Sequence, residues 1–471
     1  MYFDSPVFFV FLVIVVALYW RLSRRNQNIL LLIASYFFYG WWDWRFLLLM
    51  AASTTLDFFL AQKIDHTALL RQKKILLAIS LIVNFGFLGI FKYFNFFTGS
   101  FLTLLGSLGV HGAPIATLKI LLPPGISFYT FQEVAYIVDV YHGKLKSADS
   151  LVEYALFISL FPHLIAGPIQ QPSHLLPQVQ AARVMDREKF FDGQMLIVFG
   201  LLQKCVVADN CALIANAAFN GTLGKPSIPT VLLGAYAFAG QIYGDFAGYS
   251  NIARGCAQLL GFHFMINFRQ PYLATSFQDF WRRWHISLSS WLRDYLYIPL
   301  GGNRKGKLRT YVNLLATMLL GGLWHGANWT FVVWGAMHGA ILALERVLGI
   351  NSDGDERSHS VSAWVKRIAT FNLVCLSWIF FRATSLQQAM TFLRGLSIWA
   401  WQPAYANAFA FLAIFFAPML AIDLLVEHHP GDEYMFQGSG VRARALLGLA
   451  VFAIVTLVSA SDLNAFIYFQ F

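Results

Sequence analysis

Charged residues are scarce in this chain. Aspartate, glutamate, lysine and arginine make up 12% of its 471 residues, whereas soluble domains typically carry about 25%. Hydrophobic residues account for 58% and aromatic residues for 17%. So little charge does not suit an ordinary water-soluble domain, and the composition therefore indicates an integral membrane protein.

Cysteine is also rare, and the cysteines do not occur in a closely spaced motif. The four cysteines are Cys205, Cys211, Cys256 and Cys375, and no C-x-x-C pair occurs. This spacing offers no thiol pair of the kind used in zinc or redox motifs. We interpret the four residues as thiols of the hydrophobic core, with metal or redox chemistry as the alternative.

The apolar residues come in separate runs, each near the roughly 20 residues that a helix needs to cross about 30 Å of hydrocarbon. Alternating segments typical of a β-barrel are not seen. We therefore predict an all-α integral membrane protein with about ten to thirteen transmembrane helices. The clearest runs are Pro6–Trp20, Ile29–Tyr39, Phe46–Leu60, Ile75–Phe97, Leu151–Ile165, Phe190–Val207, Val231–Tyr243, Tyr311–Leu323, Trp329–Leu344, Trp364–Phe381, Ala406–Val426 and Ala445–Ala460.

The distribution of charge predicts the orientation in the membrane. The stretch "MYFDSPVFFV" carries no lysine or arginine, and "RLSRR" follows the first apolar run. This order is the reverse of a signal peptide and predicts a retained helix with its N-terminus outside. The net charge of +10 is concentrated in loops such as "KIDHTALLRQKK", "ARVMDREK", "RKGKLR" and "VRAR". These loops are expected in the cytoplasm, and no motif for binding nucleic acid accompanies them.

An amphipathic segment lies between Ser276 and Arg309. Its large apolar residues recur at steps of three and four, which predicts one helix that ends near Pro299. Because its charges are dense, this helix is expected at the cytoplasmic interface or in a cavity lined by protein. His285 follows Trp281 by four residues and should point inward with the tryptophans. Alternatively, the segment serves only to anchor the protein at the membrane interface.

A second histidine, His325, stands in the apolar stretch "GLWHGANWTF". Along a helix it lies about 22 Å from Thr310, well inside the membrane. An ionisable residue at this depth is a functional candidate, because it needs a polar cavity or a partner. A neutral imidazole in apolar surroundings suits a general base. The alternative is a hydrogen bond to a neighbouring helix.

Four segments carry a resemblance to a known family. They are "LPPGISFYTFQEVAYIVDVYHGK", "LFPHLIAGPIQQPSHLLPQ", "QDFWRRWHISLSSWLRDYLYIPLGGNRKG" and "LLGGLWHGANWTFVVWGAMHG". Together they resemble the membrane-bound O-acyltransferase family, in the bacterial branch that includes the membrane subunit of alginate O-acetyltransferase. The resemblance implies one polytopic domain over residues 1–471, with core motifs at about 122–339 and peripheral helices at 1–121 and 340–471. It also implies a ring of helices, with re-entrant or interfacial helices, around a central tunnel.

The resemblance assigns roles to the two histidines. His325 corresponds to the essential histidine of the family, and His285 to a second motif position that is commonly asparagine in eukaryotic members. Arg282, Arg283, Arg304 and Lys305 are weaker candidates for attracting an anionic donor, because their charges also fit a purely topological role.

The implied reaction moves an acyl group, with acetyl favoured, from a cytoplasmic thioester to hydroxyls of an exported polysaccharide or cell-wall glycan. The donor would be acetyl-CoA or an acyl-carrier protein, with no permanently bound cofactor and no metal. A periplasmic or surface protein would accept the acyl group, and the location would be a bacterial cytoplasmic (inner) membrane. D-alanyl transfer to teichoic acids and a non-catalytic polysaccharide or lipid transporter are the alternatives.

Five further polar residues lie in apolar sequence: Tyr129, Gln132, Asp139, His163 and His338. We expect them to form hydrogen bonds between helices. A zinc site formed by His338 with the two motif histidines has no supporting H-x-x-x-H or HExxH spacing.

Overall fold

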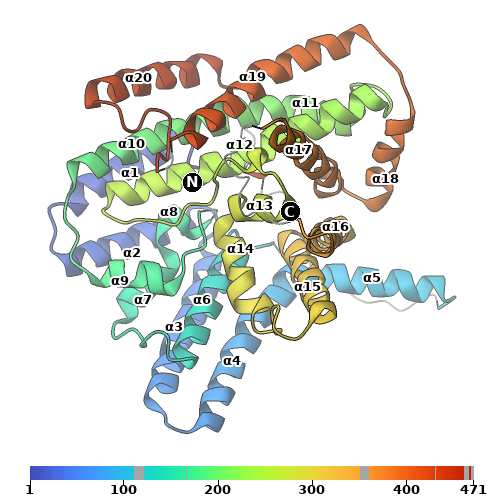
Figure 1. Ribbon diagram of the computed structural model, residues 1–471. Coiled ribbons are helices and arrows are strands. Elements are labelled where there is room, and N and C mark those ends of the chain that lie inside the picture. The colour runs from blue at the N-terminus through green and yellow to red at the C-terminus, as the bar shows by residue number, and fades with distance from the viewer. Residues whose placement is uncertain (111–120, 166, 351–359, 430, 461–465, 468–471) are drawn as a thin grey trace. The chain divides into compact units, whose positions relative to one another are not determined.

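The computed structural model describes residues 1–110, 121–165, 167–350, 360–429, 431–460 and 466–467 (Figure 1). All regular elements within these ranges are helices, which confirms the predicted all-α class. The chain divides into two compact units. Unit 1 comprises Met1, Ser5–Met185 and Leu260–Phe264, and unit 2 comprises Tyr2–Asp4, Asp186–Leu259 and Met265–Phe471. The single domain over residues 1–471 stays a prediction.

Unit 1 contains the N-terminal helices. These are α1 (Pro6–Tyr19), α2 (Arg24–Gly40), α3 (Arg45–His66), α4 (Leu70–Leu88), η1 (Gly89–Tyr93), α5 (Phe94–Ser107), α6 (Ile126–Tyr141), α7 (Leu151–Ser159), α8 (Phe161–Leu164) and α9 (Pro172–Gln180). Within this unit, α3 contacts α4, α6 and α7, and α6 also contacts α4 and α7.

Unit 2 contains the remaining elements. These are α10 (Arg187–Leu201), η2 (Leu202–Ala208), α11 (Asp209–Phe219), α12 (Ile228–Leu259), η3 (Pro271–Leu273), α13 (Phe277–Arg283), α14 (Ile286–Leu292), η4 (Arg293–Tyr297), α15 (Lys307–His325), α16 (Trp329–Val347), α17 (Val361–Arg382), α18 (Leu386–Arg394), η5 (Gly395–Ser397), α19 (Pro403–Glu427) and α20 (Val441–Val458).

Six helical segments of the described residues are long and apolar enough to cross a membrane: Arg45–His66, Leu70–Ser107, Arg187–Phe219, Val361–Arg382, Pro403–Glu427 and Val441–Val458. This is fewer than the ten to thirteen predicted spans. Several predicted runs lie in helices that are short, such as α1 and α7, or that carry polar residues at one end, such as α2 and α15. The helices nevertheless support a multi-pass membrane protein.

Large apolar side chains on several of these helices point away from the protein. Ile82 on α4 is 71% exposed, Ile414 on α19 is 65% exposed and Leu457 on α20 is 83% exposed. Such exposure is unfavourable in water, but lipid chains offer these side chains an apolar environment. The exposed side chains therefore agree with a location in a bilayer.

Glycines allow α10 and α12 of unit 2 to pack closely (Figure 1). A Cβ atom added to Gly248 of α12 would lie 2.6 Å from the carbonyl oxygen of Gly200 on α10. A Cβ atom added to Gly255 would lie 2.4 Å from the carbonyl oxygen of Gly193. Small residues at matched positions let helix backbones meet in membranes, and here they fix the position of α12 against α10.

We predict that Gly248→Ala lowers the melting temperature of the detergent-purified protein, because the added methyl group collides with backbone. Overpacking of this kind typically costs about 1–3 kcal/mol. Gly86→Ala on α4 is the matched control, because no atom lies within 4 Å of its added Cβ. The control should be neutral or stabilised by the higher helix propensity of alanine. Equal melting temperatures for the two variants would contradict the close contact.

Candidate active site

The close approach of α15 and α16 positions His325. A Cβ atom added to Gly322 would lie 2.2 Å from the carbonyl oxygen of Phe331, and one added to Gly335 would lie 2.2 Å from that of Met318. The two backbones are therefore in direct contact. His325 is the last residue of α15, one turn after Gly322. The turn that follows His325 is short, because α16 begins at Trp329.

Aromatic rings surround the His325 imidazole. The side chain is 3% exposed. Its ring centroid lies 5.1 Å from that of Trp324, 5.2 Å from that of Trp334 and 5.1 Å from that of Phe381. Apolar surroundings disfavour the charged form of an imidazole, and the neutral form is the one that accepts a proton. The structure therefore places His325 in an environment that suits a base.

The predicted single helix around His285 is wrong, because the chain breaks at this residue. Helix α13 ends at Arg283 and α14 begins at Ile286. His285 has φ 44° and ψ 53°, which is the left-handed conformation. A residue with a side chain adopts this conformation at a cost of about 1–3 kcal/mol, and such strain clusters at functional sites. The prediction that His285 points inward is confirmed, since its exposed fraction is 0%.

Asn267 holds the segment that contains this break. Its carbonyl oxygen accepts the Ile286 N–H at 3.0 Å. Its side-chain oxygen accepts the Ser287 N–H at 3.2 Å and the Ser287 hydroxyl at 2.7 Å. The Asn267 amide nitrogen donates to Ser250 on α12 at 3.1 Å. These bonds satisfy the first turn of α14 and tie His285 to α12, so they compensate the cost of the left-handed backbone.

The His285 ring is buried without a hydrogen-bond partner. Neither ring nitrogen has one in the part of the chain that the structure describes. The ring lies 4.6 Å from Phe246 and 6.0 Å from Trp324, centroid to centroid. Burial lowers the pKa of His285 to about 3, so that the imidazole is neutral near pH 7. A neutral imidazole offers one donor and one acceptor, and here neither is used by a described residue.

One indole thus contacts both candidate histidines. The centroid of the Trp324 ring lies 5.1 Å from that of His325 and 6.0 Å from that of His285. Sequence reasoning did not single out Trp324 or Asn267. The position of Trp324 beside His325 is visible in the sequence, whereas the contacts of Asn267 depend on a pairing across about twenty residues that no local pattern reveals.

The other polar candidates behave largely as expected. His338 accepts a hydrogen bond from the Trp281 indole at 3.2 Å and bonds to Ser377 at 2.9 Å. This arrangement confirms the predicted interhelical role, because it joins α13, α16 and α17. His163 bonds to Gln132 at 3.3 Å. Asp139 pairs with Lys144 at 3.5 Å, and its interhelical role stays a prediction. Tyr129 differs from the expectation, because its hydroxyl has no hydrogen-bond partner among the described residues.

A polar pocket of about 610 Å³ lies in unit 2 beside the His285 segment. Tyr243 and Ala247 of α12 line it, while Phe246 between them contacts His285. The pocket wall carries both signs of charge. Its charged lining residues are Arg254, Arg269, Asp279, Arg282, Arg283, Asp423, Glu427, Asp432 and Glu433.

The four basic candidates lie in two different parts of the structure. Arg282 and Arg283 line the pocket, but Arg304 and Lys305 do not and are exposed in the turn before α15. Arg283 forms ion pairs with Asp279 at 2.7 Å and with Glu427 at 3.0 Å. Its charge is therefore already balanced. Both arginines line the pocket, with Arg282 exposed and Arg283 buried.

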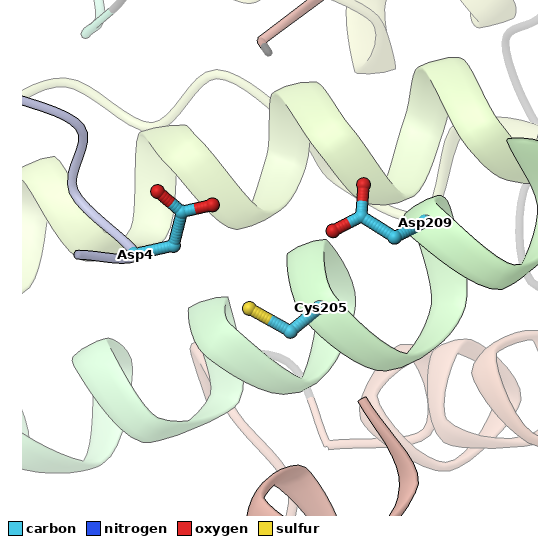
Figure 2. Close-up of side chains that lie close together, drawn as sticks. All are labelled: Asp4, Cys205 and Asp209. Atoms are coloured by element: carbon cyan, nitrogen blue, oxygen red, sulfur yellow. The ribbon is translucent and has the colours of Figure 1, made fainter. Parts of the chain in front are cut away.

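A separate cluster brings Asp4, Cys205 and Asp209 together (Figure 2). The Lys204 ammonium lies 2.8 Å from Asp209 and 3.1 Å from Asp245, so these two carboxylates share one positive charge. Burial raises the pKa of Asp4, and the nearby ammonium opposes this effect. All four cysteines are buried as free thiols, as predicted. The absence of a metal stays a prediction.

Comparisons with known proteins identify the family of this chain. The family described as MBOAT, membrane-bound O-acyltransferase family, matches residues 144–352. The probable alginate O-acetylase AlgI of Pseudomonas putida is 39% identical over the full length of both chains. A peptidoglycan O-acetyltransferase of Helicobacter pylori is 36% identical, covering 75% of this chain and 70% of the relative.

A more distant relative is the teichoic acid D-alanyltransferase of Streptococcus thermophilus. It is 31% identical over 61% of this chain and 75% of its own. The family match includes both candidate histidines, and the alginate O-acetylase aligns with the whole chain. The chain therefore belongs to the membrane-bound O-acyltransferase family and is a multi-pass membrane O-acyltransferase.

Proposed function

We propose that this protein moves an acetyl group from a cytoplasmic thioester toward hydroxyls of an exported polysaccharide or cell-wall glycan. The observation that carries the proposal is the contact of both buried histidines with Trp324. The names of two relatives, an alginate O-acetylase and a peptidoglycan O-acetyltransferase, support acetyl as the group and a polymer as the final acceptor. A bacterial cytoplasmic membrane, with the N-terminus outside, is the proposed location.

His325 is the proposed base. Its neutral imidazole accepts the proton of the acceptor hydroxyl while the oxygen attacks the thioester carbonyl. The C–S bond then breaks, the ester forms, and the imidazolium returns the proton to the departing thiolate. The aromatic rings around His325 exclude water, which would otherwise take the acyl group.

His285 is proposed to orient the reactants. Its unpartnered nitrogens offer one hydrogen-bond donor and one acceptor to the thioester carbonyl or to the incoming hydroxyl. The bonds from Asn267 fix the backbone beside it before substrate arrives, and such preorganised donors stabilise charge that develops on oxygen.

The donor is proposed to approach through the polar pocket beside this segment. Acetyl-CoA and acyl-carrier proteins are both anionic, and Arg269 and Arg282 are exposed in its lining. The basic loops are predicted to face the cytoplasm, where such a donor would be present. The tunnel implied by the family resemblance would connect the donor with an acyl-accepting protein outside.

D-alanyl transfer to teichoic acid is the second candidate. It is favoured by the teichoic acid D-alanyltransferases among the relatives, although their similarity covers less of the chain. Supplying purified protein with acetyl-CoA or with carrier-bound D-alanine separates the two reactions. Consumption of the carrier thioester alone would replace the acetyl assignment.

We predict that His325→Gln lowers acyl transfer by about 10² to 10⁴-fold, the range that general-base catalysis contributes. Thioester consumption and ester formation on the polymer would be measured together. His428→Gln is the control, because that histidine is exposed and lies in the loop after α19. Both variants should elute and melt like the native protein. Transfer above a few percent in His325→Gln would remove it from the proposed role.

A second prediction separates hydrogen bonding from proton transfer at His285. Asparagine keeps one donor and one acceptor, so His285→Asn should retain most activity. His285→Leu removes both and should lose about 10² to 10³-fold, the typical effect of deleting one preorganised donor. Rates would be measured with the same thioester. An inactive, folded His285→Asn would show that the imidazole itself transfers a proton.

A third prediction concerns orientation. A thiol introduced by Lys305→Cys should react with an impermeant reagent only from the cytoplasmic side, and one introduced by Trp44→Cys only from outside. Both positions are exposed, while the four native thiols are buried and should give little background. Reversed labelling would overturn the proposed side of donor entry.

A further inference from the structure

Two carboxyl groups are fully buried in unit 1. Asp57 lies on α3 and Glu133 on α6, and both have an exposed fraction of 0%. Asp57 accepts hydrogen bonds from the Ser80 hydroxyl at 2.6 Å and the Asn84 amide at 2.7 Å. All of these residues lie on helices of unit 1 that contact one another.

Side chains of α3 hold Glu133 in place. One of its oxygens, Oε1, accepts hydrogen bonds from the hydroxyls of Thr54 at 2.8 Å and Ser53 at 3.1 Å. Thr54 lies three residues before Asp57, on the same face of α3. The two carboxyls interact electrostatically with each other, and each receives its hydrogen bonds from uncharged groups.

Neither carboxyl has a basic partner within the described ranges. Other buried carboxylates of this protein do: Asp209 and Asp245 share the Lys204 ammonium, and Asp279 pairs with Arg283. Two like charges in an apolar environment repel strongly, and hydroxyl donors do not cancel a full charge. The like charges of Asp57 and Glu133 therefore have no compensating positive charge among the described residues.

One oxygen of the pair and one tyrosine hydroxyl also lack hydrogen-bond partners. Glu133 Oε2 and the Tyr154 hydroxyl are buried and form no hydrogen bond in the described structure. Tyr154 of α7 is 0% exposed and interacts electrostatically with both carboxyls. Tyr36 of α2 and Tyr129 of α6 also interact electrostatically with Glu133. Buried polar atoms are normally satisfied, so these oxygens point to a missing partner.

We propose that Asp57 and Glu133 form a binding site for one monovalent cation, either a proton or Na⁺. A proton would reside on Glu133 Oε2, leaving Asp57 as the carboxylate that its two donors satisfy. Sodium would instead be coordinated by carboxylate and hydroxyl oxygens, which are suitable ligands for a hard cation. The site is independent of the acyl transfer proposed above.

The test is the reaction of the detergent-purified protein with an apolar carbodiimide, which adds to protonated carboxyl groups. Modified residues would be identified by mass spectrometry across about pH 5 to 9 in sodium-free buffer. Glu133 should be modified, and its rate should fall about tenfold per pH unit above its titration point. Asp279 is an internal control that should stay unmodified, because its carboxylate forms an ion pair with Arg283 at 2.7 Å.

Added Na⁺ distinguishes the two cations. Suppression of the reaction by Na⁺, but not by choline, would assign the site to both ions in competition, whereas no effect would assign it to the proton alone. Asp57→Asn removes the like charge, so the rate at Glu133 should fall at a fixed pH. An unchanged rate in folded Asp57→Asn would overturn the paired site.

The melting temperature provides a second measurement that does not depend on carbodiimide access. A carboxyl that binds a proton more tightly in the folded state contributes stability that is lost as pH rises. The native protein should lose this stability at high pH, and Glu133→Gln should lack that dependence. No modification of either carboxyl, together with melting that is the same for native protein and Glu133→Gln at every pH and Na⁺ concentration, would overturn the proposal.

Discussion

Direct backbone contact between α15 and α16 is the constraint on which the candidate site depends. Gly322 and Gly335 leave no room for a side chain, so the helices meet where His325 ends α15. The separation of the two helices thereby sets the distance from the imidazole to Trp334. In lipid, apolar side chains gain little from association, and close packing of small residues takes over part of that role. The close packing of the two helices therefore also determines where the candidate histidine lies.

A different structural feature positions the second histidine, His285. His285 cannot be held by helix geometry, because its backbone is left-handed. Asn267 instead supplies the hydrogen bonds that an uninterrupted helix would have provided. The break directs the imidazole toward Phe246 and Trp324 rather than along the tryptophan face of a regular helix. A strained residue with long-range support is typical of a site built for function.

The sequence predicted the all-α class, the burial of both histidines and the buried cysteines, because these follow from composition and local spacing. It did not predict the break at His285, since periodicity shows where apolar residues recur but not where a distant segment such as Asn267 competes for the backbone. The charge balance of Arg283 was also missed. One partner, Asp279, lies four residues away on the same helix, but the other, Glu427, lies 144 residues away, and no local pattern reveals that pairing.

Buried charge is handled in two distinct ways in this protein. Where a carboxylate has a fixed basic neighbour, as Glu427 of α19 has in Arg283 of α13, the ion pair joins two elements. Where carboxyls meet only hydroxyls and an amide, as Asp57 and Glu133 do, the compensating charge has to come from outside the chain. The first arrangement is permanent and suits a structural link. The second is reversible, because its charge is set by the concentration of the bound cation, and it makes the stability of the helices around α3 depend on their surroundings.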